Sequence, residues 1–311
     1  MFKPTTKRAA NPQSPRKAGP TILDGRACRE ALMPRLSERV KALPTVPTLA
    51  IIQVGDRPDS TSFINAKKAF ARKLGVNEKH IKASEDVSQS ELIDIIGECN
   101  RDAAIKGIIV QLPLPVGLDK DAVIEAIDPR KDVDALTAVS VKGWLEGRED
   151  AILPATARGI RTLLGHYKID LFGKRIAVIG RSMLVGKPIA AMCLNENATV
   201  SVCHSKTPDL AAELKAADII IVAAGRPGLV GGKHVRKGQV VIDVGINRPT
   251  GEKLDEEIEE SGGQKEAPAL VGDVDFISAA KKASAITPVP GGVGPMTVFS
   301  LFENLIDLCQ K

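Results

Sequence analysis

Aromatic residues are scarce in this 311-residue chain, which contains one tryptophan, one tyrosine and seven phenylalanines. The positive charge is local, because the net charge of +5 comes from five basic residues ahead of the first acidic one: Lys3, Lys7, Arg8, Arg16 and Lys17. Without them the chain carries 38 basic and 38 acidic residues. A nucleic-acid-binding surface needs a basic face and usually stacking aromatics, so we expect no nucleic-acid partner.

Paired cysteines and long apolar runs are also lacking. The five cysteines are scattered, odd in number and never spaced as Cys-x-x-Cys, which favours a reducing compartment over a disulfide framework and indicates no zinc site. No apolar run approaches the length of a membrane span, so we expect a cytoplasmic protein without a membrane partner. Residues 1–19 are basic and interrupted by prolines. They predict a disordered tail, and organelle targeting by this tail stays open as an alternative.

The most informative stretch runs from Arg175 to Pro188 and reads RIAVIGRSMLVGKP. An apolar, β-branched run stops at Gly180, and Gly186 follows just before apolar residues at helical spacing. A strand, a tight glycine turn and a helix start together point backbone N–H groups at a phosphate. The spacing of the glycines differs from the common GxGxxG pattern, and a buried turn without any ligand would use glycine as well.

The next predicted strand, residues 199–203, ends in His204-Ser205-Lys206-Thr207. A site for NAD usually has an acidic residue near this point, which accepts hydrogen bonds from the ribose 2′-hydroxyl. Here that place holds a histidine, a hydroxyl and a lysine, and Arg181 lies in the glycine turn. Donors and positive charge suit a 2′-phosphate, so the sequence predicts NADP as the cofactor.

Strands alternate with helices over the rest of the chain, which predicts parallel βαβ units and an α/β fold. Helices are expected over residues 25–42, 60–74, 89–101, 119–127, 157–168, 186–195, 207–216 and 296–309. Strands are expected over residues 48–54, 79–83, 107–110, 175–179, 199–203, 218–223, 240–244 and 284–287.

The length of the chain suits two domains. We expect an N-terminal α/β substrate-binding and catalytic domain over residues 20–155 and a Rossmann-like NADP-binding domain over 156–295, with a C-terminal helix, 296–311, that returns to the first domain. The Pro/Gly-rich segment 288–295 follows the last strand, at the carboxyl edge where ligands bind in such sheets. Its glycines allow close approach to a flat ligand, although a rigid turn before the last helix is the alternative.

Seven motifs, in this order, resemble those of the bifunctional methylenetetrahydrofolate dehydrogenase/methenyltetrahydrofolate cyclohydrolase family. They are VGDRPDSTSFINAKK (54–68), GIIVQLPLP (107–115), KDVDAL (131–136), VIGRSMLVGKP (178–188), CHSKT (203–207), VGDVDF (271–276) and TPVPGGVGPMT (287–297). The resemblance covers nearly all of the chain after the basic tail. It implies tetrahydrofolate one-carbon derivatives as substrates and a homodimeric assembly.

The resemblance further implies two linked reactions at one site. NADP oxidises 5,10-methylenetetrahydrofolate to the methenyl cation, and water then opens the cation to 10-formyltetrahydrofolate. The family's catalytic lysine corresponds to Lys67, its hydrogen-bonding glutamine to Gln111, and the carboxylate that orients the pterin ring to Asp134, with Asp132 the weaker candidate. The side-chain chemistry agrees, since a lysine exchanges protons near neutral pH only when its pKa is depressed.

The same motifs supply the remaining candidate residues. Substrate contacts are expected from Phe63, Pro290, Gly291 and Gly292. Cofactor contacts are expected from Gly180, Arg181, Ser182, Gly186, His204, Ser205 and Ile246. On composition alone, Lys67 would be an ordinary solvated lysine like its neighbour Lys68, Gln111 a strand-end residue, and the aspartates loop charges or a helix cap.

Three positions depart from the family pattern. The tyrosine one turn before the lysine is Phe63, the segment Pro-Cys-Thr-Pro is Pro154-Ala155-Thr156-Ala157, and an Asp-Gly pair is Asp134-Ala135, which should restrict positive φ. We therefore expect the dehydrogenase to be retained and the cyclohydrolase to be more sensitive to these changes. The alternatives are a specialised paralogue with dehydrogenase activity only, and a non-catalytic protein that binds NADP or folate.

Overall fold

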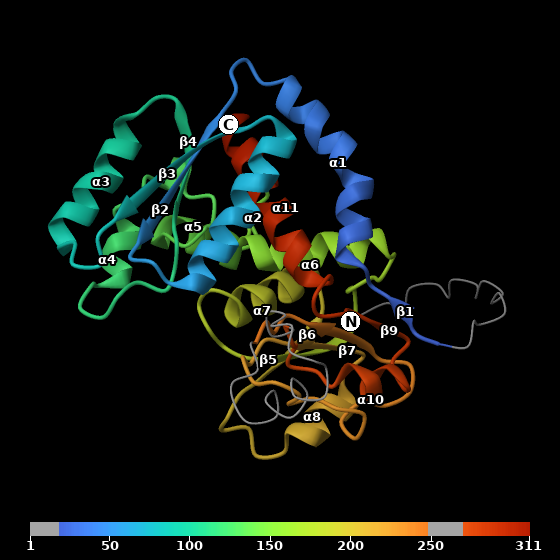
Figure 1. Ribbon diagram of the computed structural model, residues 1–311. Coiled ribbons are helices and arrows are strands. Elements are labelled where there is room, and N and C mark those ends of the chain that lie inside the picture. The colour runs from blue at the N-terminus through green and yellow to red at the C-terminus, as the bar shows by residue number, and fades with distance from the viewer. Residues whose placement is uncertain (1–18, 248–269) are drawn as a thin grey trace, which may run out of the picture.

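The computed structural model of this protein describes residues 19–247 and 270–311. The predicted disordered tail therefore lies almost entirely outside the described residues. Two parallel sheets organise the rest, one above the other in Figure 1. This is the α/β fold with two domains that the alternation of strands and helices predicts.

The first sheet has three parallel strands in the order β3-β2-β4: β2 (Thr48–Val54), β3 (Asn77–Ala83) and β4 (Ile105–Val110). All residues of β2 after Thr48 are buried, as expected for a central strand covered on both faces. The helical elements of this domain are α1 (Gly25–Lys41), α2 (Pro58–Leu74), α3 (Gln89–Arg101), α4 (Lys120–Glu125), η1 (Pro129–Lys131) and α5 (Ala138–Leu145). Ser88 and Glu91 form a reciprocal capping box that starts α3.

The second sheet has six parallel strands in the order β1-β9-β8-β7-β5-β6. They are β1 (Thr21–Ile22), β5 (Arg175–Ile179), β6 (Thr199–Cys203), β7 (Ile219–Val222), β8 (Val240–Asp243) and β9 (Ala285–Ile286). The helices of this domain are α6 (Ala155–His166), α7 (Gly186–Asn195), α8 (Leu210–Ala216) and α10 (Phe276–Ala280). The order β7-β5-β6 places the loops after β5 and β6 next to each other at the carboxyl edge.

The C-terminal helix α11 (Val293–Cys309) joins the two halves, as predicted. Figure 1 shows it running through the middle of the molecule between α2 and α6. A Cβ on Gly159 of α6 would lie 2.9 Å from the backbone of Met296, so the absent side chain lets the two helices approach closely. On the other side, the Phe70 ring of α2 packs 5.1 Å from the Phe302 ring of α11. The last helix is thus held between α6 of the second domain and α2 of the first.

Several details differ from the sequence expectation, including α8, which begins at Leu210, three residues later than expected. Thr21–Ile22 form a strand that adds to the second sheet beside β9, although we predicted that these residues belong to the first domain. Two residues are too few to show the alternation of side chains that marks a strand in a sequence. Helix α5 was not predicted. Thr137 caps it by accepting a hydrogen bond from the Ser140 N–H, and burial of Trp144 stabilises it. Helix α11 begins at Val293, three residues earlier than expected.

Candidate active site

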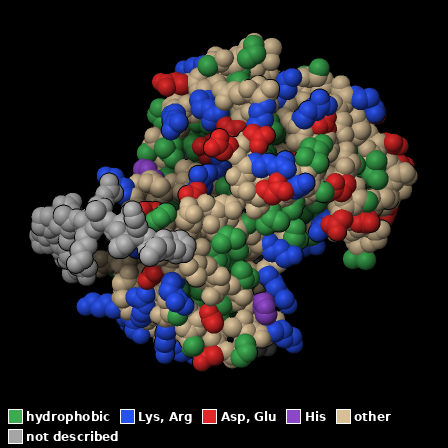
Figure 2. All heavy atoms as spheres, turned by 180° about the vertical axis from the view of Figure 1, so that it is seen from behind, with side chains coloured by type: hydrophobic (Ala, Val, Ile, Leu, Met, Phe, Trp, Pro, Cys, Tyr) green, Lys and Arg blue, Asp and Glu red, His purple; other side chains and the backbone are tan. Residues whose placement is uncertain are grey.

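A cavity of about 410 Å³ lies between the two domains. Its walls come from α2, the end of β4, the loops after β5 and β8, and the first turns of α6 and α11. Most of the lining is apolar, including Ile109, Leu136, Val244 and Leu301. Figure 2 shows hydrophobic side chains in the hollow between the upper and lower parts of the molecule. Such a cavity suits a flat ligand with few polar contacts.

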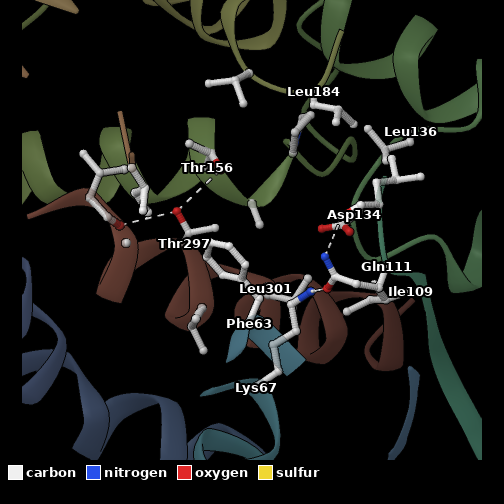
Figure 3. Close-up of a pocket in the computed structure, with 18 of the residues that line it drawn as sticks. Phe63, Lys67, Ile109, Gln111, Asp134, Leu136, Thr156, Leu184, Thr297 and Leu301 are labelled. Carbon is white, nitrogen blue, oxygen red and sulfur yellow. Dashed lines mark hydrogen bonds between the residues drawn. The ribbon is translucent and has the colours of Figure 1, made fainter. Parts of the chain in front are cut away.

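Three polar side chains meet at the first-domain end of this cavity: Lys67, Gln111 and Asp134 (Figure 3). Lys67 lies one turn after Phe63 on the same face of α2. Its Nζ donates to Gln111 Oε1 at 2.9 Å, and Gln111 Nε2 donates to the Leu112 carbonyl at 2.9 Å. The hydrogen bond expected between the lysine and the glutamine is therefore present, and the second bond sets which end of the amide faces the lysine.

The electrostatics of this group favour proton exchange. Burial lowers the pKa of Lys67 below its ordinary value, and the Asp134 charge partly opposes that shift. Burial likewise raises the pKa of Asp134, while Lys67 opposes and Asp132 adds to the rise. Desolvation disfavours the charged form of both groups, so the ammonium and the carboxyl are brought toward neutrality together. The neighbouring Lys68 instead has a carboxylate partner, with its Nζ 3.7 Å from Glu78 Oε1.

Asp132, the weaker candidate, does not line the cavity. Its side chain is buried, with 1% exposed, and its Oδ2 accepts a hydrogen bond from the Thr137 N–H at 2.8 Å. The carboxylate thus holds the turn that leads into α5, which is a structural role. Only Asp134 of the pair faces the site.

Ala135 corrects an expectation about the loop that carries Asp134. Its φ is +56° in spite of the Cβ, so the alanine adopts the backbone conformation that the glycine of the family pattern would favour. The residue is fully buried and its carbonyl accepts a hydrogen bond from Trp144 Nε1 at 3.0 Å. Tertiary contacts therefore override the local preference.

Phe63 lines the cavity with 44% of its surface exposed, so its ring face is available to a ligand. Two polar residues of the cavity lining, Thr156 and Thr297, were not selected from the sequence. Thr297 Oγ1 lies 3.5 Å from Thr156 Oγ1, and these hydroxyls are polar groups on the α6–α11 side. Both residues lie inside segments that match the family pattern, but nothing local distinguishes them from structural threonines.

The glycine turn after β5 is as tight as predicted. Gly180 has a φ of +119°, and a Cβ there would lie 2.2 Å from the Ala223 carbonyl oxygen. A Cβ on Gly186 would lie 2.2 Å from the Gly180 carbonyl oxygen. Ser182 Oγ accepts hydrogen bonds from the N–H groups of Val185 and Gly186, at 3.2 and 3.4 Å. The two glycines and the serine together form the turn, and Leu184 and Val185 extend it into the cavity.

Arg181, His204 and Ser205 lie at neighbouring strand ends. The Gly180 N–H donates to the Cys203 carbonyl at 2.9 Å, which joins the two loops. Arg181 and Ser205 are exposed, and His204 is half-buried with Nδ1 accepting from the Lys206 N–H at 3.2 Å. No acidic residue occurs between Arg181 and Lys187 or between His204 and Thr207. The donor set fits a 2′-phosphate, and the turn where a Cβ would clash fits close approach by a pyrophosphate.

Ile246 lines the cavity from the loop after β8, but Pro290, Gly291 and Gly292 do not line it. Gly291 has its carbonyl bonded to the Gly25 N–H at 2.9 Å, and a Cβ on Gly25 would overlap the Gly292 carbonyl. This segment thus packs on the start of α1, and the cavity wall begins with Val293 and Gly294. Substrate contact by the three residues stays a prediction.

Residues 19–247 and 270–311 contain neither a metal-binding cluster nor a helix that could span a membrane. No group of histidine, cysteine, aspartate and glutamate side chains in these ranges could hold a metal ion. None of the helices in them is long and apolar enough to cross a membrane.

Comparison with known proteins identifies both halves of the chain. Residues 23–134 match the family model of the tetrahydrofolate dehydrogenase/cyclohydrolase catalytic domain, and residues 154–311 match that of the family's NAD(P)-binding domain. The bifunctional protein FolD 2 of Geobacter sulfurreducens is 43% identical over 293 residues, covering 93% of this chain and 97% of the relative. FolD of Bacillus subtilis is 43% identical over 294 residues, with coverages of 94% and 98%.

Solved structures agree. The Campylobacter jejuni bifunctional FolD superposes with a TM-score of 0.85 at 41% identity, covering 93% of this chain and 98% of that one. The Trypanosoma brucei methylenetetrahydrofolate dehydrogenase-cyclohydrolase, in complex with NADP cofactor and inhibitor, has a TM-score of 0.85 at 36% identity, with coverages of 94% and 98%.

Proposed function

The chain belongs to the tetrahydrofolate dehydrogenase/cyclohydrolase family, and on that premise we propose that the cavity between its domains performs both reactions of a bifunctional enzyme. It oxidises 5,10-methylenetetrahydrofolate with NADP and hydrolyses the methenyl product to 10-formyltetrahydrofolate. The observation that carries this proposal is the hydrogen-bonded pair Lys67–Gln111 beside Asp134, in a cavity that extends to the glycine turn of the second sheet.

The NADP site fits the second-domain end of the cavity. Gly180 and Gly186 would admit the pyrophosphate, while Arg181, His204 and Ser205 would hold the 2′-phosphate. When bound, the nicotinamide supplies a hydride acceptor. The apolar walls, with Val244 and Ile246 on the cofactor side and Leu301 on the helix side, would exclude water from bound cofactor and substrate. Alignment of bound reactants accounts for much of such a rate enhancement.

Hydrolysis uses the polar end of the cavity. Neutral Lys67 accepts one proton from the water whose oxygen bonds to the methenyl carbon, and it returns that proton to the ring nitrogen as the carbon–nitrogen bond breaks. The second water proton leaves the hydroxyl group to solvent as the formyl C=O bond forms, so the cation and water give the neutral formyl product and one released proton. Gln111 holds the amine through its Oε1. Asp134 accepts hydrogen bonds from donors of the pterin ring and so fixes the orientation of that ring. The lowered pKa of Lys67, caused by burial, supports the neutral form that this role requires.

Phe63 favours a second candidate function, an enzyme with a strong dehydrogenase and a weak cyclohydrolase. A phenylalanine keeps ring stacking on the substrate but supplies no hydroxyl near Lys67. The second departure, Ala135, no longer supports this alternative, because its backbone keeps the left-handed conformation. The non-catalytic binder has no support from the geometry, since a binding protein does not need a desolvated lysine.

A spectroscopic assay with 5,10-methylenetetrahydrofolate, run in parallel with NADP and NAD, tests the proposal. We expect NADPH formation without build-up of methenyl absorbance. Methenyl build-up beyond spontaneous hydrolysis would support the Phe63 alternative. Preference for NAD would contradict the roles of Arg181 and Ser205, and no reduction with either cofactor would overturn the proposed function.

Three further proposals rest on family membership. The domain boundaries are placed after residues 155 and 295, and the packing of α11 against the first domain supports the assignment of residues 296–311 to that domain. A homodimer and a cytoplasmic location are proposed on the same basis. Sedimentation and localisation of the tagged full chain would test the two latter proposals.

A further inference from the structure

Asn304 is a fully buried polar residue, with 0% of its surface exposed, on the face of α11 that forms the cavity wall. Thr297 and Leu301 line the cavity from the two preceding turns, and helical spacing puts Asn304 below them on the same face. Burying an amide is costly unless its donors and acceptor are all bonded. The partners of Asn304 therefore indicate what the residue does.

Both amide hydrogens of Asn304 are used on the main chain. Its Nδ2 donates to the Val133 carbonyl and to the Leu153 carbonyl, each at 2.8 Å. Val133 directly precedes Asp134, and Leu153 directly precedes Pro154, which also lines the cavity. One side chain thus ties the loop that carries Asp134 to the segment that enters α6.

Arg158 on α6 holds the other end of the same amide. Its Nη1 donates to Asn304 Oδ1 at 2.7 Å and to Asp307 Oδ2 at 2.5 Å, and its Nε lies 3.3 Å from Glu303 Oε2. A guanidinium can only donate hydrogen bonds, so the Asn304 amide must point its oxygen toward Arg158. Its NH2 group then faces the carbonyls of Val133 and Leu153. The orientation of Asn304 is consequently fixed by a network that spans α6 and α11.

The residue after Asp134 is held as well. Trp144 Nε1 donates to the Ala135 carbonyl at 3.0 Å, and Trp144 is buried. Buried donors therefore hold the carbonyls on both sides of Asp134, from α5 on one side and from α11 on the other. Between them the backbone at Asp134 has little freedom, although its side chain points into the cavity.

We propose that Asn304 is a positioning residue for both reactions: by holding Val133 it aims the Asp134 carboxylate at Lys67 and at the substrate ring. This inference rests on the proposed function, because it concerns the geometry of a group that acts there. Asn304 itself does not touch the reacting atoms. Arg158 supports it from the opposite side of the amide.

The test replaces Asn304 with leucine, which has a similar size but no hydrogen-bonding group. Gln239→Leu is the matched control, because Gln239 is also fully buried and its Nε2 donates to two main-chain carbonyls, those of Leu214 and Ala217, at 2.6 and 2.7 Å. Gln239 lies at the start of β8, away from the cavity lining. Both variants lose the same kind of contact, and only one of them lies next to Asp134.

We expect Asn304→Leu to lower kcat/KM for 5,10-methylenetetrahydrofolate roughly ten- to a hundredfold, the scale of a small misplacement in an active site. The loss should be in the KM for the folate, with the KM for NADP unchanged. The acidic limb of the hydrolysis rate should move to lower pH, because Lys67 keeps its burial while Asp134, whose charge raises the Lys67 pKa, moves away. The other charged group that acts on this pair is Asp132, which raises the pKa of Asp134. Gln239→Leu should change none of these quantities.

A parent-like folate KM and pH profile in Asn304→Leu would overturn the proposal. So would a fall in kcat alone that matches the fraction of folded protein, since that indicates a purely structural role. If the leucine variant is not recovered folded, Asn304→Ala is measured by the same criteria, and failure of both variants to fold would also assign a structural role. Failure of the proposed function is distinguishable, because the parent enzyme would then show no turnover.

Discussion

Replacing Gly186 with alanine tests whether the turn after β5 is shaped for close approach of a phosphate. The new Cβ would lie 2.2 Å from the Gly180 carbonyl oxygen, 2.5 Å from its carbonyl carbon and 2.8 Å from the Arg181 nitrogen. All three are backbone atoms, so no flexible side chain can move aside. Relief requires the turn to shift by about 1 Å, and overpacking of this kind costs about 1–3 kcal/mol of stability.

The shift should affect the cofactor far more than the folate. A displacement of this size can weaken a positioned interaction by roughly a hundredfold. The parent enzyme at an NADP concentration of about 100 times its Kd gains about 2.7 kcal/mol from binding, and Gly186→Ala should lose most of that gain. Hydrolysis of added methenyltetrahydrofolate without NADP should continue, because Lys67, Gln111 and Asp134 lie at the other end of the cavity.

The measurements are thermal unfolding with and without NADP, together with NADP titration and the hydrolysis assay. Gly165→Ala is the control, because Gly165 lies in α6 and a Cβ added there would meet no neighbouring atom within 4 Å. That substitution should stabilise the protein by about 0.5–1 kcal/mol through helix propensity. Parent-like NADP binding and stability in Gly186→Ala would refute the reasoning about the turn.

Four further predictions follow from the site. Lys67→Met should abolish hydrolysis while the neighbouring Lys68→Met, which loses only an ion pair to Glu78, should retain it; equal hydrolysis rates in the two variants would contradict the role of Lys67. The hydrolysis rate should rise with pH as Lys67 loses its proton at its lowered pKa. Asp134→Asn should move this rising part of the pH–rate profile to lower pH, because the carboxylate that raises the Lys67 pKa is gone. A profile that does not move would argue against electrostatic coupling between Lys67 and Asp134. Phe63→Tyr should raise the ratio of cyclohydrolase to dehydrogenase rates if the missing hydroxyl limits hydrolysis, and an unchanged ratio would remove the argument for the second candidate function. Ser205→Asp should weaken NADP relative to NAD, by repulsion of a 2′-phosphate, and an unchanged ratio of the two KM values would contradict that contact.

Some candidate residues could be selected from the sequence because their signal is local. Gly180 and Gly186 follow a β-branched strand and precede a helix, and both glycines are required by backbone approaches of 2.2 Å. Lys67 and Gln111 lie in motifs of the family, one on a helix and one at a strand end. The hydrogen bond between them joins residues 44 positions apart, and only the family pattern pointed to it.

Other residues gave no local signal. Asp132 and Asp134 look alike in the sequence, and burial and the hydrogen bond from Thr137 separate a structural carboxylate from one that faces the cavity. Asn304 meets Val133 across 171 positions of the chain, a distance at which neither spacing nor propensity predicts a contact. Ala135 contradicts a sound local rule, because contacts from Trp144 and neighbouring residues outweigh the modest cost of a positive φ.

The sequence by itself therefore determined the α/β class, the order of the two domains and the glycine turn, since these depend on periodicity, backbone sterics and residue type over short stretches. It also predicts NADP from the charge of the residues near the turn. The tertiary structure decided which aspartate faces the ligand, which loop segment forms the wall and how Asp134 is held. It also decided the direction in which the pKa of Lys67 is shifted. A pKa depends on the dielectric and the charges around a group, and those surroundings are assembled from α2, β4, α6 and α11 only when the chain has folded.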